Sequence, residues 1–117
     1  MARRDLTGAV DFTVLETMTA GVDDVTEEVL GLFVQQAALW SPLLDASAEG
    51  WRDATHTIRG ASAGIGANDL AAVCAEVEHG EQDQAHAGLE RVRTALDAAL
   101  SDIAAYRHEM MLRSLKG

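Results

Sequence analysis

His56 is the residue whose neighbours in the sequence best suit chemistry at a side chain. An imidazole can act as a nucleophile near neutral pH because one of its ring nitrogens carries a free lone pair. Arg52 stands four residues before His56 and Arg59 three residues after it, so a helix would bring both guanidinium groups to its side. Guanidinium groups bind phosphate oxygens through charge-assisted hydrogen bonds. The spacing therefore predicts a histidine that holds a phosphoryl group, with Arg59 and Arg52 neutralising the phosphate charge.

Small residues follow His56 where a helix would favour larger ones. The helical stretch around His56 holds three glycines, and each costs about 1 kcal/mol in a helix interior relative to alanine. A helix turns by about 100° per residue, which places Gly60 and Ala63 beside His56. We expect Gly60 and Ala63 to give a large partner access to the imidazole, and Gly64 and Gly66 to shape the end of the helix.

The same helical geometry places the large apolar side chains on the opposite face. Trp51, Ile58 and Ile65 fall more than about 130° away from His56. They predict a core-facing side, and His56 then lies at the centre of the solvent-facing side. Because single histidines on polar helix faces are often merely solvated, position alone leaves a phosphoacceptor and a plain surface histidine both open.

Helices must position this stretch, and the rest of the chain supplies them. A chain of 117 residues with 48% apolar residues, a single proline and abundant alanine and leucine favours one all-helical domain. Short connections force neighbouring helices to run antiparallel. We expect an up-down-up-down four-helix bundle with a short extra N-terminal helix. The expected divisions are a loose arm over residues 1–10, a single domain over 11–113, and helices at 11–18, 22–40 and 50–64, from 67 to a break at 80–84, and from 85 onward.

Two helices carry apolar residues at steps of three and four, the spacing of a core-facing stripe. In the second helix the predicted stripe is Val25, Val29, Leu32, Phe33, Gln36 and Trp40. In the last helix it is Ala85, Leu89, Val92, Leu96, Ala99, Ile103, Tyr106 and Met110.

Composition excludes several classes of function. The net charge of −10 makes nucleic acid and anionic membrane surfaces poor partners. No apolar run approaches the length of a membrane span and no targeting signal is recognised, so we expect a cytoplasmic protein. No nucleotide-binding loop is present, so phosphorylation from ATP is not expected.

Metal chemistry and disulfide chemistry are also not expected. Cys74 is the single cysteine, and it falls on the apolar side of the fourth helix as an inert thiol. His79, His86 and His108 are too widely spaced, without clustered carboxylates, to predict a metal site.

The segment around His56 resembles the signature of the histidine-containing phosphotransfer (Hpt) family. The signature has an active histidine, an apolar residue, a basic residue, a glycine, small residues and a final Gly-Ala. The matching positions are His56, Ile58, Arg59, Gly60, Ala61, Ser62, Gly66 and Ala67, continued by Leu70, Cys74 and Glu78 and preceded by Leu15 and Phe33. The resemblance covers roughly residues 9–105.

This resemblance implies a carrier rather than an enzyme. Hpt domains accept a phosphoryl group on the outward Nε2 of the histidine, from a receiver aspartate or a sensor histidine kinase, and pass it to a receiver aspartate. The receiver brings Mg²⁺, and no cofactor of the carrier's own is implied. Many members place Gln or Glu at the position of Glu78, in contact with the other imidazole nitrogen. We therefore expect Glu78 to orient His56 and leave Nε2 unprotonated.

Receivers are expected to dock around His56 on the second and third helices, near Gln35, Gln36 and Leu39, and the protein is expected to be a monomer. A rival interpretation is a non-catalytic helical adaptor or dimerisation bundle. A variant of it is a degenerate Hpt domain that binds receivers but carries no phosphate.

Overall fold

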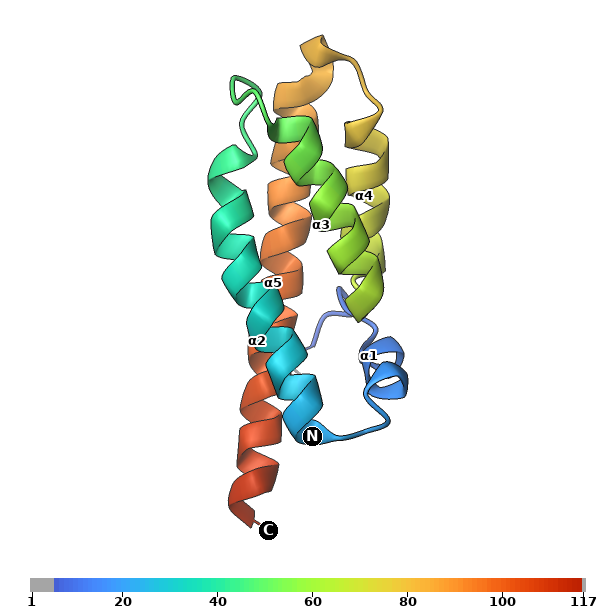
Figure 1. Cartoon of the computed structure of the whole chain (residues 1–117), viewed down its shortest axis with the longest axis vertical. Coiled ribbons are helices and arrows are strands. Elements are labelled where there is room, and N and C mark those ends of the chain that lie inside the picture. The colour runs from blue at the N-terminus through green and yellow to red at the C-terminus, as the bar shows by residue number, and fades with distance from the viewer. Residues whose placement is uncertain (1–5, 117) are drawn as a thin grey trace.

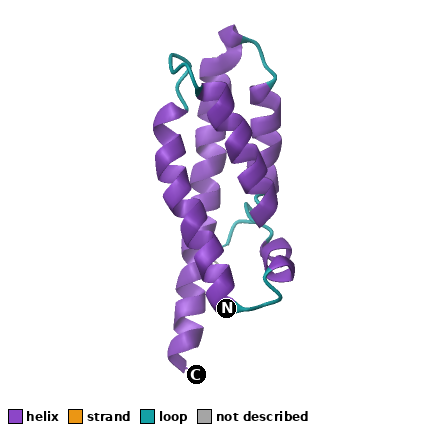
Figure 2. Ribbon diagram, in the orientation of Figure 1, coloured by secondary structure: helices purple, strands orange, loops and turns teal. Residues whose placement is uncertain are grey.

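The computed structural model describes residues 6–116, and these residues form five α-helices and two 3₁₀ turns (Figures 1 and 2). The α-helices are α1 (Phe12–Met18), α2 (Asp23–Trp40), α3 (Trp51–Ile65), α4 (Asn68–Glu78) and α5 (Ala85–Lys116). The 3₁₀ turns are η1 (Ser41–Leu43) and η2 (Gln82–Gln84).

Helices α2 to α5 run alternately up and down as a bundle, and the molecule is elongated, with extents of 53 × 23 × 21 Å (Figure 1). Helices α3 and α4 pack closely along their length, and the short α1 lies past their lower ends (Figure 1). The predicted all-α bundle with an extra N-terminal helix is confirmed.

Helix α1 begins where the sequence predicts a cap. The Asp11 carboxylate accepts a hydrogen bond of 3.1 Å from the Thr13 N–H, which satisfies one of the free donors of the first turn. Phe12 is buried and stacks on Tyr106 of α5, with 4.1 Å between ring centroids. This contact fixes α1 against the bundle.

The expected loose arm over residues 1–10 differs from the structure where it can be compared. Residues 1–5 lie outside the described part of the chain, but residues 6–10 are tied to α5. Thr7 and Ala9 donate their backbone N–H groups to the carboxylate of Asp102, at 2.9 and 3.0 Å, and Val10 is buried. A buried acceptor on α5 orders a segment that has no helical pattern of its own, which is why the sequence pattern did not show it.

The predicted core stripe of α2 is wrong in register. Phe33 and Trp40 are buried as expected, but Val25 and Leu32 are about half exposed. The buried positions of α2 are Thr26, Leu30, Phe33, Ala37 and Trp40. Two of these buried residues, Thr26 and Ala37, are polar or small, so the apolar pattern of the sequence does not reveal this stripe. The Thr26 hydroxyl can be buried because it hydrogen-bonds to the Thr19 hydroxyl at 2.8 Å.

The predicted stripe of α5 is confirmed at all eight positions, each of which is buried. Helix α5 is longer than its neighbours, and its last turns extend past them beside the start of α2 (Figure 1). There Arg107 pairs with Glu27 of α2, with Nε 2.9 Å from Oε1. The two helices are thus also joined by an ion pair beside the core.

Glycine ends α3 and lets the start of α1 approach closely. Gly66 has φ +87°, and the N–H groups of Gly66 and Ala67 donate to the carbonyls of Ala63 and Ser62. A Cβ on Gly66 would lie 2.2 Å from the Asp11 carbonyl oxygen, so a larger residue would displace α1. The prediction that Gly66 shapes the end of the helix is confirmed, whereas Gly64 lies inside α3.

Candidate functional site

His56 lies on the solvent-facing side of α3. Its side chain is 60% exposed, while Trp51, Ile58 and Ile65 on the other side of the helix are buried. The predicted orientation of α3 is confirmed. The imidazole stands on a packed helix rather than a loop, so its backbone is fixed.

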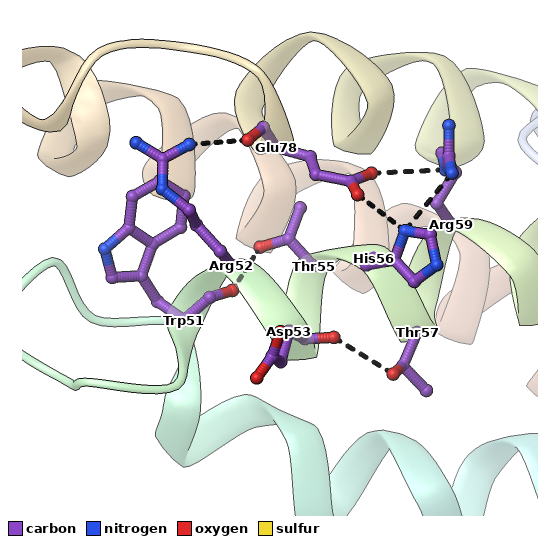
Figure 3. A network of polar contacts seen from close by, with 8 residues as sticks. All are labelled: Trp51, Arg52, Asp53, Thr55, His56, Thr57, Arg59 and Glu78. Carbon is purple, nitrogen blue, oxygen red and sulfur yellow. Dashed lines mark hydrogen bonds and ion pairs between the residues drawn. The ribbon is translucent and has the colours of Figure 1, made fainter.

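The Glu78 carboxylate, at the last residue of α4, holds one nitrogen of this ring. Glu78 Oε2 lies 2.5 Å from His56 Nδ1, and the Glu78 side chain is only 14% exposed (Figure 3). The predicted contact between Glu78 and the imidazole is present. It joins neighbouring helices at residues 22 positions apart in the chain.

This contact determines where the imidazole carries its proton. A carboxylate is only an acceptor, so a bond of this length needs a proton on Nδ1. In the neutral ring the lone pair then belongs to Nε2, on the side of the ring away from Glu78. The neutral ring thus presents its unprotonated nitrogen to the solvent.

Arg59 braces the same carboxylate. Its Nε lies 3.3 Å from Glu78 Oε1, an ion pair whose alignment falls short of a hydrogen bond. Its Nη2 also lies 3.2 Å from His56 Nδ1, but with the proton on Nδ1 this approach is a contact rather than a hydrogen bond. The Arg59 side chain is 36% exposed, so its guanidinium group borders both the ring and the solvent.

Arg52 does not lie where the sequence prediction requires. Its Nη1 and Nη2 donate to the backbone carbonyls of Glu78 and Gly80, at 2.6 and 2.9 Å, and its guanidinium carbon lies 4.4 Å from the centroid of the Trp51 ring. Figure 3 shows the group directed away from His56. The guanidinium group thus binds the free carbonyls at the end of α4 rather than lying beside His56, so the expected phosphate contact of Arg52 stays a prediction.

The space beside His56 is open. Beyond its chain neighbours and the backbone of its own helix, a Cβ built on Gly60 would meet no atom of the described residues within 4 Å, and Ala63 is exposed. Contacts within the protein therefore do not require glycine at residue 60, which agrees with clearance for a partner.

The expected docking residues are exposed on α2. Gln35 and Gln36 face the solvent, and Leu39 is 67% exposed. Helix α2 packs against α3, on the side of Asp53 and Thr57 (Figure 3). The corrected register of α2 adds apolar side chains to this exposed face.

Among residues 6–116, no group of three or more His, Cys, Asp or Glu side chains could hold a metal ion. Burial, reinforced by the charge of Glu78, raises the pKa of the Cys74 thiol to about 11, so the thiol is protonated at neutral pH. Within the same residues, no helix is both long and apolar enough to cross a membrane.

Sequence reasoning missed two side chains that bind backbone groups of other segments, one beside the site and one away from it. These are Arg52, read as a phosphate ligand, and Asp102, buried on α5. A charged residue inside an apolar stripe was the one available signal for Asp102. No local pattern distinguishes a guanidinium group that binds phosphate from one that binds carbonyls.

Comparisons with known proteins agree with this geometry. The sequence profile of the Hpt domain matches residues 15–105. The crystal structure of the histidine phosphotransferase ShpA from Caulobacter crescentus is 56% identical, with a TM-score of 0.83 over 92% of this chain and 99% of that chain. A search of curated proteins gave no match. The chain belongs to the Hpt domain family and is a histidine phosphotransfer protein, a phosphoryl carrier of a phosphorelay.

Proposed function

We propose that His56 is the phosphoacceptor and that Nε2 is its nucleophilic atom. The observation that carries the proposal is the 2.5 Å contact between Nδ1 and the largely buried Glu78 carboxylate, on a ring that is otherwise exposed. A carboxylate at this distance favours the proton on Nδ1, which supports a lone pair on the accessible nitrogen. A histidine that only contacts solvent is not expected to have a largely buried carboxylate bound to one ring nitrogen.

The transfer step follows from this arrangement. The Nε2 lone pair attacks the phosphorus atom of an aspartyl phosphate, the N–P bond forms, and the P–O bond to the aspartate breaks. The donor aspartate leaves as a carboxylate, and the proton stays on Nδ1. The phosphorylated ring then carries a positive charge, which the adjacent Glu78 carboxylate stabilises. The reverse sequence of bonds delivers the phosphoryl group to another aspartate.

Arg59 stabilises the phosphoryl group in this proposal. It lies one helical turn from His56 and keeps about a third of its side chain exposed. Its Nη groups can therefore reach phosphate oxygens while Nε stays close to Glu78. Gly60 and Ala63 leave room for the phosphoryl group and for the backbone of the partner.

Hpt domains interact with two-component kinases and receivers and typically need no cofactor of their own. For this chain we propose cytoplasmic receiver domains, with or without a sensor histidine kinase, as partners of a monomeric carrier. The receiver supplies Mg²⁺ beside its aspartate. Gln35, Gln36 and Leu39 on α2 form part of the docking surface, because they are exposed on the helix that packs against α3.

A transfer assay tests the site. The protein is incubated with a ³²P-labelled phosphorylated receiver and Mg²⁺, and acid-labile label on the carrier is measured. His79→Gln is the matched control, since His79 is also an exposed histidine. We expect label on the wild type and the control and none on His56→Gln. Label that persists in His56→Gln would overturn the assignment, and receivers that bind without transferring label would indicate a degenerate Hpt domain.

A further inference from the structure

The end of α4 is held by a side chain from another helix. The last carbonyls of a helix have no partner within it and carry partial negative charge. At the end of α3 the left-handed backbone of Gly66 brings N–H groups back to the free carbonyls, which accept hydrogen bonds from them. Helix α4 ends at Glu78 without a left-handed residue, and the carbonyls of Glu78 and Gly80 accept from Arg52 instead.

Residues of α3 therefore bind Glu78 through both its backbone and its side chain. Its backbone carbonyl binds Arg52 at 2.6 Å, and its carboxylate binds His56 Nδ1 at 2.5 Å (Figure 3). Arg52 and His56 are four residues apart, so they lie on successive turns of one rigid helix. Their separation is thus fixed, and it sets how far the Glu78 side chain must reach.

The guanidinium group is itself held in place. Its carbon lies 4.4 Å from the centroid of the Trp51 ring, and Trp51 is buried and donates from Nε1 to Gln82 Oε1 at 3.3 Å. An arginine stacked on a fixed aromatic ring and bound to two carbonyls loses less conformational entropy per bond than a free one. The support is consequently stiffer than an ordinary surface contact.

We propose that Arg52 is a positioning residue for phosphotransfer, which acts by fixing the last turn of α4 so that Glu78 keeps the proton of His56 on Nδ1. The inference rests on the proposed role of Nε2 as the nucleophile. Helix ends otherwise fray, and local opening at a terminus requires little free energy. Without Arg52 the Glu78 carboxylate leaves the ring part of the time, and the imidazole then exchanges between both tautomers.

The test measures the tautomer directly. The ¹⁵N chemical shifts of the His56 ring are recorded by NMR, at a pH where the ring is neutral, for the wild type, Arg52→Gln and Arg52→Lys. Phosphate acceptance is measured on the same samples. We expect a single Nδ1–H tautomer in the wild type. In Arg52→Gln we expect a mixture of tautomers and roughly fivefold slower acceptance. Partial recovery is expected in Arg52→Lys, whose ammonium group can reach one carbonyl.

Arg93 supplies the matched control. It also donates to two backbone carbonyls, those of Leu44 and Ser41 at 3.0 and 3.2 Å, but it does so after α2 rather than α4. Arg93→Gln therefore removes the same kind of contact and lowers stability without touching Glu78. We expect its ring shifts to match those of the wild type.

The outcomes separate this inference from the function on which it rests. An unchanged tautomer in Arg52→Gln overturns the positioning role, and slower transfer with that unchanged tautomer would assign Arg52 to phosphate binding instead. An equal change in Arg93→Gln would also overturn it, since the effect would then be general. If the wild type accepts no phosphate on His56, the proposed function fails, while the ring shifts still decide whether Arg52 controls the tautomer.

Discussion

Two carboxylates withdrawn from water, Glu78 and Asp102, hold distant parts of the chain together in different ways. Asp102 is fully buried and accepts three hydrogen bonds, two from backbone N–H groups and one from the Thr7 hydroxyl. Glu78 is 14% exposed and faces an imidazole and a guanidinium group. Asp102 joins residues 7 and 9 to α5, and Glu78 joins α3 to α4.

The difference lies in whether the partners can change. Backbone N–H groups and a hydroxyl keep the same charge under all ordinary conditions, so the Asp102 contacts are permanent and structural. In the proposed function, the imidazole beside Glu78 gains positive charge when it is phosphorylated, so the strength of that contact would change during the reaction. A carboxylate with fixed donors supports the fold, whereas one with a partner of variable charge can support chemistry.

The largest effect on phosphate acceptance is expected from replacing His56, the partner of Glu78 whose charge can change. His56→Gln should abolish phosphate acceptance, because an amide has no lone pair able to displace the aspartate. The fold should remain, since His56 is exposed and contributes nothing to the core. Acid-labile labelling and circular dichroism check the two halves of this prediction. Unfolding of His56→Gln would show that the Glu78 contact is structural like that of Asp102.

Removing the permanent carboxylate should chiefly cost stability. Asp102→Ala leaves the N–H groups of Thr7 and Ala9 without their acceptor, and we expect a loss of about 2–3 kcal/mol in the free energy of unfolding. Urea denaturation measures this loss, with Asp97→Ala, an exposed carboxylate on the same helix, as the control. Transfer by the folded fraction should keep the rate of the wild type. A slower rate would contradict a purely structural role.

Changing Glu78 should chiefly slow transfer and have little effect on stability, the opposite of changing Asp102. In Glu78→Ala the ring loses its orienting carboxylate, and we expect acceptance to slow about tenfold while stability falls by less than about 1 kcal/mol. Single-turnover transfer kinetics provide the measurement. Glu76→Ala removes an exposed carboxylate of α4 that pairs with Arg91, and it should transfer normally. Unchanged kinetics in Glu78→Ala would remove its proposed role.

The smallest effect concerns Cys74, a buried group next to this site. Its thiol has a pKa of about 11 in the folded protein against an ordinary value of 9.0, so the folded state holds the proton more tightly. Stability should therefore be unaffected below pH 9 and decline between pH 9 and 11, by about 1 kcal/mol at pH 10. Urea denaturation at pH 7.5 and pH 10 should show this loss in the wild type and not in Cys74→Ala.

The charge of Glu78 helps raise this pKa, which links the thiol to the comparison of the two carboxylates. Glu78→Gln should reduce the loss at pH 10, and Asp102→Asn should leave it unchanged. An equal effect of both substitutions would contradict the assignment.

The parts of this structure that the sequence predicted are those with long, regular patterns. The apolar stripe of α5 and the opposite faces of α3 depend only on helical geometry, so they could be placed. The contact of Glu78 with His56 came from the family signature. The register of α2 was missed because Thr26 and Ala37 are buried without being large and apolar.

Contacts between distant segments were beyond prediction for a different reason. Arg52 and Asp102 bind backbone groups, and backbone groups look the same at every residue. Which carbonyl or N–H lies within reach depends on how the helices pack, and that information is not contained in any local pattern.

The position of His56 on one exposed face of a packed helix has a consequence for the order of the proposed phosphoryl transfers. A single projecting ring can meet only one aspartate at a time, so a donor and an acceptor must take turns at the same surface. Each turnover then requires the carrier to leave one partner before it meets the next. Because α3 holds the ring in one orientation, the donor and the acceptor aspartate would approach Nε2 from the same side of the helix.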